Sequence, residues 1–290
     1  MARVVVAGAT GYLGRFVVRA LVARGHHVVA LCRPGKTVAE ASVVAHVDVL
    51  QPSTLRGVCE GATAVFSGLG ITRQNDGVTY EDVEFLANGH VLDEAIRAGA
   101  SRFGLIAAVR PDLFGDLAIA ASKERFISRL RAEGPPANVR PVVVRATGFF
   151  SDLSDVFDMA RSGRVWMIGD GRARVNPVHG EDLAEVCADA LLGEGAYTNG
   201  VPEDVEVGGP EVFSWNEIVD LAEQSLGQPV ARTHLPPALV GAALSVVGLV
   251  RPRAAAVGRF IARGAVNDVV APCHGRHRLG ELYQELAHAS

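Results

Sequence analysis

Three glycines at regular spacing follow the first apolar segment of the chain. Arg3–Ala7 is a short β-branched run that predicts a strand, and Tyr12–Arg24 has apolar residues at helical spacing. Between them, Gly8, Gly11 and Gly14 form a G-x-x-G-x-x-G pattern. In a strand–loop–helix unit such glycines permit a tight turn, a close approach of the backbone to a pyrophosphate, and close packing of the helix on the sheet. The pattern therefore predicts a dinucleotide-binding loop rather than an ordinary turn.

Strand-like and helix-like segments alternate over the first 150 residues. The apolar runs lack polar alternation, which is typical of strands buried on both faces of a parallel sheet. This alternation predicts right-handed βαβ units, and therefore an α/β fold of the Rossmann type with a doubly wound parallel sheet. The predicted strands after the first are His27–Cys32, Val43–Val47, Ala64–Ser67, Phe103–Ala108 and Pro141–Arg145, and the longer predicted helices are Tyr80–Ala98 and Ala118–Ala132.

The pattern becomes more irregular after residue 150. A helix over Asp152–Arg161, a strand over Val165–Ile168 and a helix over 181–192 are predicted, and prolines recur from Pro202 onward. We expect residues 1–150, with a return at about 176–195, to form the dinucleotide-binding domain. Residues 151–290 are expected to form mainly a smaller region that caps and binds the substrate.

The amino-acid composition argues against several classes of binding partner. The formal net charge is −4 and no block of Lys and Arg stands out, which argues against nucleic acid and anionic membranes. The four cysteines lie far apart without a CxxC pair, so neither a metal site nor a disulfide framework is expected. Free thiols and the lack of a visible targeting segment favour a cytoplasmic location.

One late segment, Ala238–Val250, is apolar throughout and lies between Pro237 and Pro252. It is too short to span a bilayer, which needs about 20 apolar residues. A buried or lid-like helix is favoured over a contact with a membrane.

The residues after the second predicted strand bear on the choice of dinucleotide. An NAD-binding protein usually places Asp or Glu there to bind the ribose 2′-hydroxyl. This chain instead has Arg33, followed three residues later by Lys36. A guanidinium suits a 2′-phosphate because it can donate two parallel hydrogen bonds to it. The sequence therefore favours NADP(H) over NAD(H).

Several blocks resemble a known family. Gly8–Gly14 resembles the phosphate loop of atypical short-chain dehydrogenases/reductases, above all of the NmrA-like and isoflavone-reductase-like NAD(P)H-binding proteins. The other blocks that carry the resemblance are Ser67–Gln74, Asp82–Asn88, Thr147–Asp152, Asn176–Ala184 and Asn267–Pro272. Together they extend over nearly the whole chain.

The resemblance implies roles for individual positions. Gly8, Thr10, Gly11, Tyr12 and Leu13 would line the pyrophosphate, and Arg33 would bind the 2′-phosphate. Asp48 and Val49 would flank the adenine, while Ser67, Gly68 and Leu69 would lie over the adenosine side. Lys123 would bind the nicotinamide ribose, and Ala146, Thr147, Gly148 and Phe149 would pass the nicotinamide ring.

The chain departs from the catalytic pattern of this superfamily. The usual Tyr of Y-x-x-x-K is replaced by Ile119, four residues before Lys123, and the usual Ser falls in an Ala107–Val109 stretch. The phenol normally donates a proton to the developing alkoxide. Lys123, Asp152, Asp155 and His179 are the alternative donors, although Asp at a helix start and a lone His are also common structural features.

Three interpretations remain open. The leading one is an NADPH-dependent reductase of a small apolar carbonyl, enone or quinone, in which the proton comes from another side chain or from water. The aromatic and apolar residues Phe149, Phe150, Phe157, Met159 and Trp166 would wall such a substrate, unless they belong to the core. The alternatives are a non-catalytic regulator that binds NADP(H), and a redox-neutral dehydratase, epimerase or rearrangement enzyme. Oligomeric state stays open.

Overall fold

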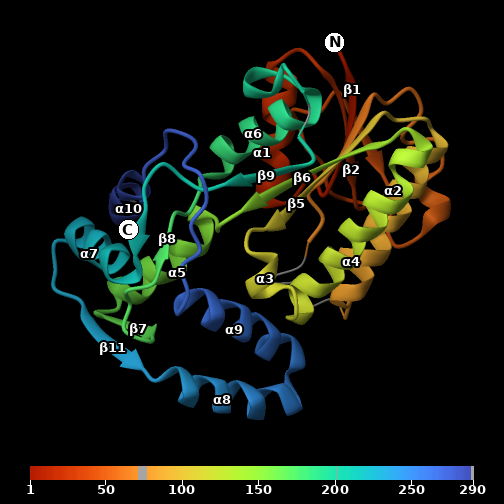
Figure 1. Ribbon diagram of the computed structural model, residues 1–290. Helices are drawn as coiled ribbons and strands as arrows, with labels where there is room; N and C mark the ends of the chain where they lie inside the picture. The colour runs from red at the N-terminus through yellow and green to blue at the C-terminus, as the bar shows by residue number, and fades with distance from the viewer. Residues whose placement is uncertain (71–76, 201, 289–290) are drawn as a thin grey trace. The chain divides into compact units, whose positions relative to one another are not determined.

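The computed structural model describes residues 1–70, 77–200 and 202–288 of the chain. These residues form two compact units (Figure 1). Unit 1 contains Met1–Ala107, Ala118–Arg145 and Leu183–Val205, and unit 2 contains Ala108–Leu117, Ala146–Asp182 and Glu206–Ser290. Whether these units correspond to a cofactor domain and a substrate domain stays a prediction, because compactness alone does not show what a unit binds.

Unit 1 is built on a seven-stranded sheet with the order β3-β2-β1-β4-β5-β6-β9. Its strands are β1 (Arg3–Ala7), β2 (His27–Cys32), β3 (Val43–His46), β4 (Ala64–Ser67), β5 (Arg102–Ala108), β6 (Arg140–Ala146) and β9 (Asp204–Val207). The register is parallel around β1, where Val5 lies opposite Val29 of β2 and Val65 of β4. The predicted Rossmann-type α/β fold is confirmed, with the reversal of strand order at β1 and β4.

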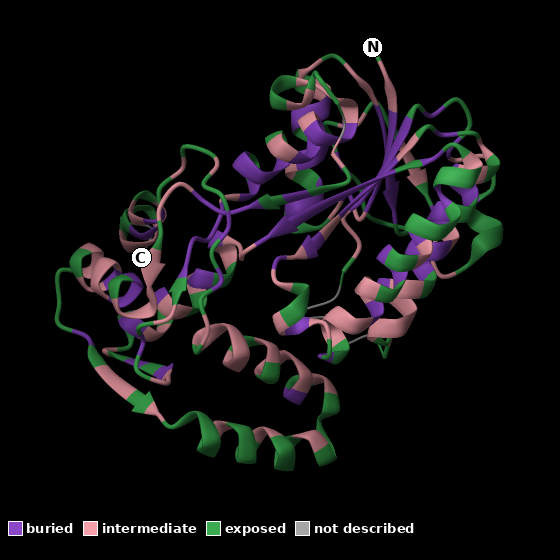
Figure 2. Ribbon diagram, viewed as in Figure 1, coloured by how far each residue is buried: buried purple, intermediate pink, exposed green. Residues whose placement is uncertain are grey.

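Helices cover both faces of this sheet, so its central strands are almost wholly buried (Figure 2). The helices of unit 1 are α1 (Tyr12–Ala23), α2 (Asn88–Arg97), α4 (Ala118–Glu133) and most of α6 (Gly180–Leu192). The helical turns are η1 (Pro52–Leu55), η2 (Glu81–Ala87), η3 (Pro135–Ala137) and η4 (Gly195–Tyr197). Phe103 of β5 and Phe126 of α4 pack in the core with ring centroids 5.8 Å apart.

The predicted helix Tyr80–Ala98 differs from the observed structure in its first half. Residues Glu81–Ala87 form a π-helix, η2, and only Asn88–Arg97 form a regular α-helix. The side-chain amide of the buried Asn88 donates to the carbonyl groups of Val83 (3.0 Å) and Glu84 (3.1 Å). These two hydrogen bonds reach back to carbonyl groups four and five residues earlier in the π-helix, a feature that hydrophobic periodicity does not reveal.

Unit 2 is assembled from shorter elements around its own core. Helices α5 (Phe150–Arg161), α7 (Trp215–Leu226) and α10 (Leu279–His288) pack together, next to two small sheets. The strands are β7 (Arg164–Ile168), β8 (Arg174–Val175), β10 (Phe213–Ser214) and β11 (Ala231–Leu235). Strand β7 pairs in parallel with β11, and β8 pairs antiparallel with β10.

The core of unit 2 includes two residues that were candidates to line a substrate-binding site. Phe150 and Phe157 are 2% and 0% exposed, and Phe157 stacks on the buried Tyr283 of α10. Of the two alternatives for these rings, the structure supports the core, because both belong to the buried cluster of unit 2. Of the other candidates, Trp166 is 54% exposed and Met159 packs at the edge of the core.

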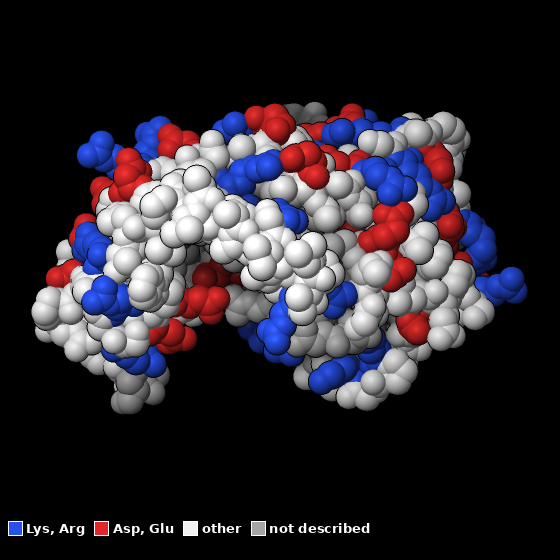
Figure 3. Space-filling model, turned by 90° about the horizontal axis from the view of Figure 1, so that it is seen from below, with Lys and Arg blue, Asp and Glu red and all other residues white. Residues whose placement is uncertain are grey.

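The apolar segment near residue 240 forms helix α8 (Pro237–Val250), which packs on α9 (Pro252–Ala265). The expectation of a buried helix is wrong, since α8 contains no buried residue and Leu249 and Val250 are 85% and 81% exposed. Within the described residues, no helix combines the length and hydrophobicity that crossing a membrane requires. Figure 3 views the molecule from the side on which α8 lies, and uncharged side chains form a broad band there.

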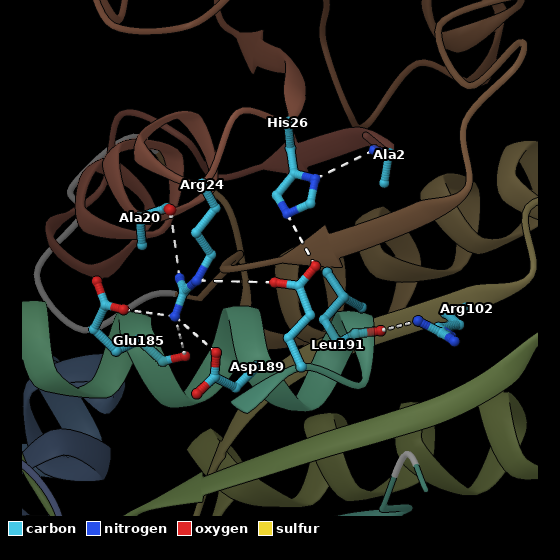
Figure 4. A network of polar contacts seen from close by, with 9 residues as sticks. Ala2, Ala20, Arg24, His26, Arg102, Glu185, Asp189 and Leu191 are labelled. Carbon is cyan, nitrogen blue, oxygen red and sulfur yellow. Dashed lines mark hydrogen bonds and ion pairs between the residues drawn. The ribbon is translucent and has the colours of Figure 1, made fainter. Parts of the chain in front are cut away.

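A network of ion pairs joins α6 to the first βα unit (Figure 4). The Arg24 guanidinium, just after α1, contacts Glu185 at 2.5 Å and Asp189 at 2.7 Å, both on α6. His26 accepts a hydrogen bond from the Ala2 amide (3.2 Å), and its other ring nitrogen lies 3.2 Å from Glu194. Side chains of residues 24–26 and of residues 185–194 thus hold the returning helix beside the start of the sheet.

Candidate functional site

The glycine loop after β1 has a conformation that excludes larger residues. Gly8 has a φ of 73°, and a Cβ atom there would lie 2.7 Å from the carbonyl carbon of Gly68. A Cβ atom on Gly14 would lie 2.1 Å from the Gly8 carbonyl oxygen. Both contacts are with backbone, which cannot turn aside as a side chain can. The Gly11 amide closes the loop by donating to the Gly8 carbonyl at 2.9 Å.

The N-terminus of α1 offers amides to an anion. Gly11 is the N-cap residue, so no side chain caps the helix, and the first turn holds no acidic residue. Free amides and the helix dipole favour a phosphate at such an end. Tyr12 is 38% exposed and Thr10 is half-buried, whereas Leu13 is 6% exposed and can offer only its backbone.

The loops after β1 and β4 meet at the point where the strand order reverses. Because β1 lies between β2 and β4, a crevice at their carboxyl ends is expected, and dinucleotides bind there in folds of this type. The close approach of Gly8 to Gly68 forms the floor of this junction. Residues Ile71–Gln74, the rest of the block that begins at Ser67, lie outside the described residues.

Arg33 and Lys36 lie in the loop that follows β2, and both side chains are exposed. The Lys36 amide donates to the Arg33 carbonyl at 3.0 Å, so a tight turn brings the two residues together. This position after β2 is where a ribose 2′-substituent is expected in the fold. Two cations there suit a phosphate.

Asp48 and Val49, predicted beside the adenine, have structural contacts of their own. The Asp48 carboxylate accepts hydrogen bonds from the Leu50 amide (3.0 Å) and the Gln51 side chain (3.1 Å). The Val49 carbonyl lies 3.0 Å from a ring nitrogen of His90, and its side chain packs at the core. Asp48 therefore shapes the turn before η1, and contact with a base stays a prediction.

The side chain of Ser67, at the end of β4, also forms a hydrogen bond within the protein. Its hydroxyl donates to the side-chain oxygen of Asn88 at 2.5 Å, and it is 1% exposed. Asn88, which is fully buried, thus joins the β4 loop to the π-helix η2. Any contact of Ser67 with a cofactor would have to use its backbone.

Lys123 lies on α4, one turn after Ile119, as the spacing predicts. Its ammonium group donates to the Leu69 carbonyl (2.7 Å) and the Ile106 carbonyl (3.2 Å), and lies 2.8 Å from the Glu84 carboxylate. Two of its protons therefore form hydrogen bonds with carbonyl groups, and its charge is paired with the Glu84 carboxylate. The group holds the loop after β4 against η2, and binding of a ribose by Lys123 stays a prediction.

Sequence reasoning missed Glu84 as the partner of Lys123. Its side chain is 4% exposed, although it follows Asp82 in a segment rich in acids. A helical pattern places Glu84 on one face of a predicted helix but cannot show that a lysine of another helix meets it. The π-helical turn also moves it from the face that regular spacing would give.

In unit 2, three separate blocks meet around the buried Asn176. Its side chain donates to the Ala271 carbonyl (2.8 Å) and accepts from the Ala271 amide (3.1 Å). The Thr147 hydroxyl donates to the Asn176 carbonyl at 2.6 Å, and the Gly148 carbonyl accepts from the Val178 amide at 2.8 Å. These bonds fix the backbone of the stretch that was predicted to pass the nicotinamide, where Ala146 is buried and Phe149 is partly exposed.

Asp152 and His179, the other candidate acids, differ in their surroundings. Asp152 is exposed, and its carboxylate accepts a long hydrogen bond (3.4 Å) from the Phe149 amide at the start of α5. This contact is that of a helix cap, which satisfies a free amide. His179 is partly buried and lies edge-on to the Phe150 ring, with centroids 5.7 Å apart.

His179 belongs to a cluster that the sequence did not suggest. Its ring lies 4.2 Å from that of His277, whose Nδ1 is 2.8 Å from the Asp182 carboxylate and whose Nε2 is 3.5 Å from Glu181. Burial, with a contribution from His277, lowers the pKa of His179 below its usual range, which favours the neutral ring. One ligand atom from each of His179, Glu181 and His277 lies within 4.8 Å of the others, a spacing that a cation can bridge.

Asp182, which contacts His277 in this cluster, is held in place by several hydrogen bonds. Asp182 accepts hydrogen bonds from the backbone amides of Arg276 (2.9 Å) and His277 (3.0 Å) as well as from the His277 ring. Burial opposes the charged form, but these hydrogen bonds outweigh it and lower the pKa of Asp182. His277 lies almost a hundred residues from Asp182 in the sequence, so no local signal pairs them.

Comparison with known proteins agrees with this geometry. Residues 8–133 match the NAD(P)H-binding family. The chain is 32% identical over 227 residues to the chloroplastic divinyl chlorophyllide a 8-vinyl-reductase of Oryza sativa subsp. indica, covering 71% of this chain and 54% of that protein. The chain therefore spans about half the length of this relative.

Two further matches are more distant. The photosystem II assembly factor Ycf39 of Synechocystis sp. is 23% identical over 248 residues, covering 82% of this chain and 72% of that protein. The solved structure of the Escherichia coli NADPH-dependent quinone oxidoreductase QOR2 with NADPH superposes with a TM-score of 0.73 at 18% identity, covering 98% of this chain and 99% of that one. Residues 8–133 therefore belong to the NAD(P)H-binding family, and the strand order gives the chain a Rossmann-type fold.

Proposed function

We propose that the protein is an NADPH-dependent reductase of a small, largely apolar substrate that carries a conjugated C=C bond, an enone or a quinone-like ring. The observation that carries this proposal is the arrangement on α4. Ile119 stands where a tyrosine acid would lie, and the Lys123 ammonium is held by two carbonyl groups and paired with the Glu84 carboxylate. Reduction of a conjugated system gives a delocalised anion that water can protonate, so such a substrate needs no side-chain acid.

The residues of the chain would then bind and orient rather than donate protons. The backbone amides at the start of α1 would hold a pyrophosphate, and Arg33 with Lys36 would bind a 2′-phosphate. When bound, NADPH supplies the hydride. The Lys123 ammonium keeps the loop after β4 in place beside the glycine loop through the Leu69 carbonyl. The vinyl-reductase relative supports chemistry on a C=C bond.

The choice of NADPH over NADH is tested by Arg33→Ala. A charge-assisted hydrogen bond contributes about 1.5–3 kcal/mol, so NADPH affinity should fall by roughly 10- to 100-fold while NADH affinity stays nearly constant. Arg140→Ala is the matched control, because Arg140 is also exposed but lies at the opposite, amino end of its strand. Equal losses for both dinucleotides would refute the assignment of Arg33.

The reaction class is tested by NADPH oxidation with matched substrates. Enones, quinones and vinyl-substituted aromatic compounds should be reduced, and saturated ketones of the same size should not. Faster turnover of the saturated ketones would show that the site contains an acid and would overturn the proposal. Conversion with NADP in only catalytic amounts would instead indicate a redox-neutral enzyme.

A second candidate function is a non-catalytic protein that binds NADP(H). The same engaged Lys123 and the absence of a tyrosine at position 119 favour it, and the Ycf39 relative is an assembly factor by name. Tight NADPH binding without turnover of any substrate in the panel would support this role.

A cytoplasmic location stays a prediction, which rests on the free cysteines.

A further inference from the structure

Helix α8 exposes apolar side chains on every side that α9 does not cover. Leu244 and Gly248 face α9, since a Cβ atom on Gly258 would lie 2.5 Å from Leu244 and one on Gly248 would lie 3.5 Å from Ala255. The rest of the helix faces outward, and its 14 residues include no charged side chain. The exposed fractions are 60% for Leu239, 67% for Val246, 85% for Leu249 and 81% for Val250.

The other side of α9 is already occupied, so α8 is an outer layer of unit 2. Phe260 of α9 stacks on Phe114 of α3 (Pro111–Phe114) with ring centroids 4.5 Å apart. Arg263 of α9 pairs with Asp116 and donates to the Leu113 carbonyl at 2.9 Å. Within unit 2 the layers therefore run α3, α9, α8, and the apolar side of α8 faces outward.

Helices α8 and α9 and the turn between them form a hairpin, and all of its charged side chains are positive. Residues 236–267 contain four arginines (Arg251, Arg253, Arg259 and Arg263) and no Asp or Glu, whereas the whole chain has a net charge of −4. Arg251 at the tip between the helices and Arg259 on α9 are exposed. In Figure 3, Lys and Arg side chains, together with Asp and Glu side chains, lie at the borders of the uncharged band. Exposed apolar side chains next to the arginines of the same hairpin complement the acyl chains and the anionic headgroups of a lipid surface.

We propose that the α8–α9 hairpin, Pro237–Ala265, docks the protein on an anionic lipid surface, with α8 lying in the plane of the interface. A helix of 14 residues is about 21 Å long, shorter than the hydrocarbon core of about 30 Å, so it lies on the membrane rather than crossing it. Leu249 and Val250, next to Arg251, would enter the acyl boundary while the guanidinium groups meet phosphate.

A second copy of the chain fits this face less well than lipid. A two-fold contact through α8 would bring the arginines of one hairpin toward those of the other without any acid in either. Like charges facing one another disfavour such an interface. An anionic bilayer supplies both the apolar phase and the negative charge.

The test uses the full chain and vesicles, without cofactor or substrate, so that its result is independent of the proposed reductase function. The protein is sedimented with vesicles of phosphatidylcholine alone and of phosphatidylcholine mixed with phosphatidylglycerol. Binding is expected only to the anionic vesicles, and it should weaken as salt screens the charges. No sedimentation with either kind of vesicle would overturn the proposal.

Two pairs of variants locate the surface. Leu249→Asp/Val250→Asp should reduce vesicle binding by about tenfold or more with an unchanged melting temperature, because both residues are exposed. Val212→Asp is the control, since Val212 is 42% exposed in unit 2 but lies outside the hairpin. Arg251→Glu/Arg253→Glu should abolish the preference for anionic lipid, whereas Arg172→Glu, at an 85% exposed residue, should not.

Other occupants give distinct results. If the protein is a dimer that Leu249→Asp dissociates and neither form binds vesicles, a second copy covers α8 and the proposal is wrong. If the same variant instead raises KM for a water-soluble substrate without affecting vesicle binding, α8 belongs to a substrate lid and the proposal is again wrong. Equal vesicle binding by the Leu249→Asp/Val250→Asp and Val212→Asp variants also contradicts it.

Discussion

The Lys123 ammonium group lies 2.8 Å from the Glu84 carboxylate, and the two side chains are only 13% and 4% exposed. Two carbonyl groups, of Leu69 and Ile106, complete the contacts of the lysine. The lysine that the family resemblance assigns to cofactor binding is thus also the centre of a buried ion pair. Changing it affects stability as well as activity, and experiments have to separate the two.

Lys123→Met is expected to lower the free energy of unfolding by about 3–5 kcal/mol, because it leaves the Glu84 carboxylate buried without its cation. The double variant Lys123→Met/Glu84→Leu should recover part of this loss, since it removes the uncompensated charge. Urea unfolding followed by circular dichroism measures both values.

Arg125→Met is the control for this comparison. Arg125 lies on the same helix and pairs with Glu81 at 2.9 Å, but these side chains are 60% and 41% exposed. An exposed pair contributes about 0–1 kcal/mol, so this change should be nearly neutral. Equal losses in the Lys123→Met and Arg125→Met variants would contradict a buried ion pair at Lys123.

Asn88→Ala is expected to destabilise the protein by about 2 kcal/mol or more. The change leaves the Ser67 hydroxyl without its acceptor, and the carbonyl groups of Val83 and Glu84 without their side-chain donor, in a fully buried site. Asn267→Ala removes one hydrogen bond, to the Arg263 carbonyl, and should cost about 1 kcal/mol. Thermal unfolding that gives the Asn88 variant the smaller loss would rule out the linking role of this amide.

The cluster around His179 predicts a pH-dependent stability. Burial lowers the pKa of His179 in the folded state below the value of about 6.5 in the unfolded chain. Its contribution to stability is therefore present above about pH 6.5 and is lost as the pH falls through the lowered folded-state pKa. His179→Gln should flatten this part of the curve of unfolding free energy against pH.

Asp182 adds a second decrease in the free energy of unfolding, at a lower pH. Hydrogen bonds outweigh burial and hold its folded-state pKa below the unfolded value of about 3.9, so its contribution is lost only below that pH. An unaltered slope in the His179→Gln variant would count against the cluster.

The four cysteines differ in accessibility, and all lie in the described part of the chain. Cys32, Cys59 and Cys187 are buried and only Cys273 is exposed. Burial raises the pKa of the Cys59 thiol to about 12, and it also raises the pKa values of Cys32 and Cys187. Ellman's reagent should therefore modify one thiol rapidly in the native protein and four after denaturation, and Cys273→Ser should remove the rapid phase. Rapid modification of two or more thiols would contradict the burial of Cys32, Cys59 and Cys187.

Some features of the fold could be predicted closely because their causes are local. The apolar runs of the strands and the glycine spacing after β1 need only backbone geometry and hydrophobic period to be interpreted. The strand and helix boundaries around them differ from the predicted ones by two residues or fewer. The exceptions are informative, since η2 departs from α-helical geometry where the Asn88 amide turns back toward carbonyl groups of the preceding turn.

The sequence by itself determined the class of the protein: a Rossmann-type fold, a glycine loop for a dinucleotide, a cation after β2, and the loss of a tyrosine at Ile119. Only the tertiary structure decided that Lys123 is bound to Glu84, that Phe150 and Phe157 are core, and that His179 meets His277. It also decided that α8 lies exposed rather than buried. The physical reason is that hydrophobic period and turn chemistry act over a few residues, whereas these contacts join residues tens to about a hundred positions apart, and their energies depend on burial that no local pattern encodes.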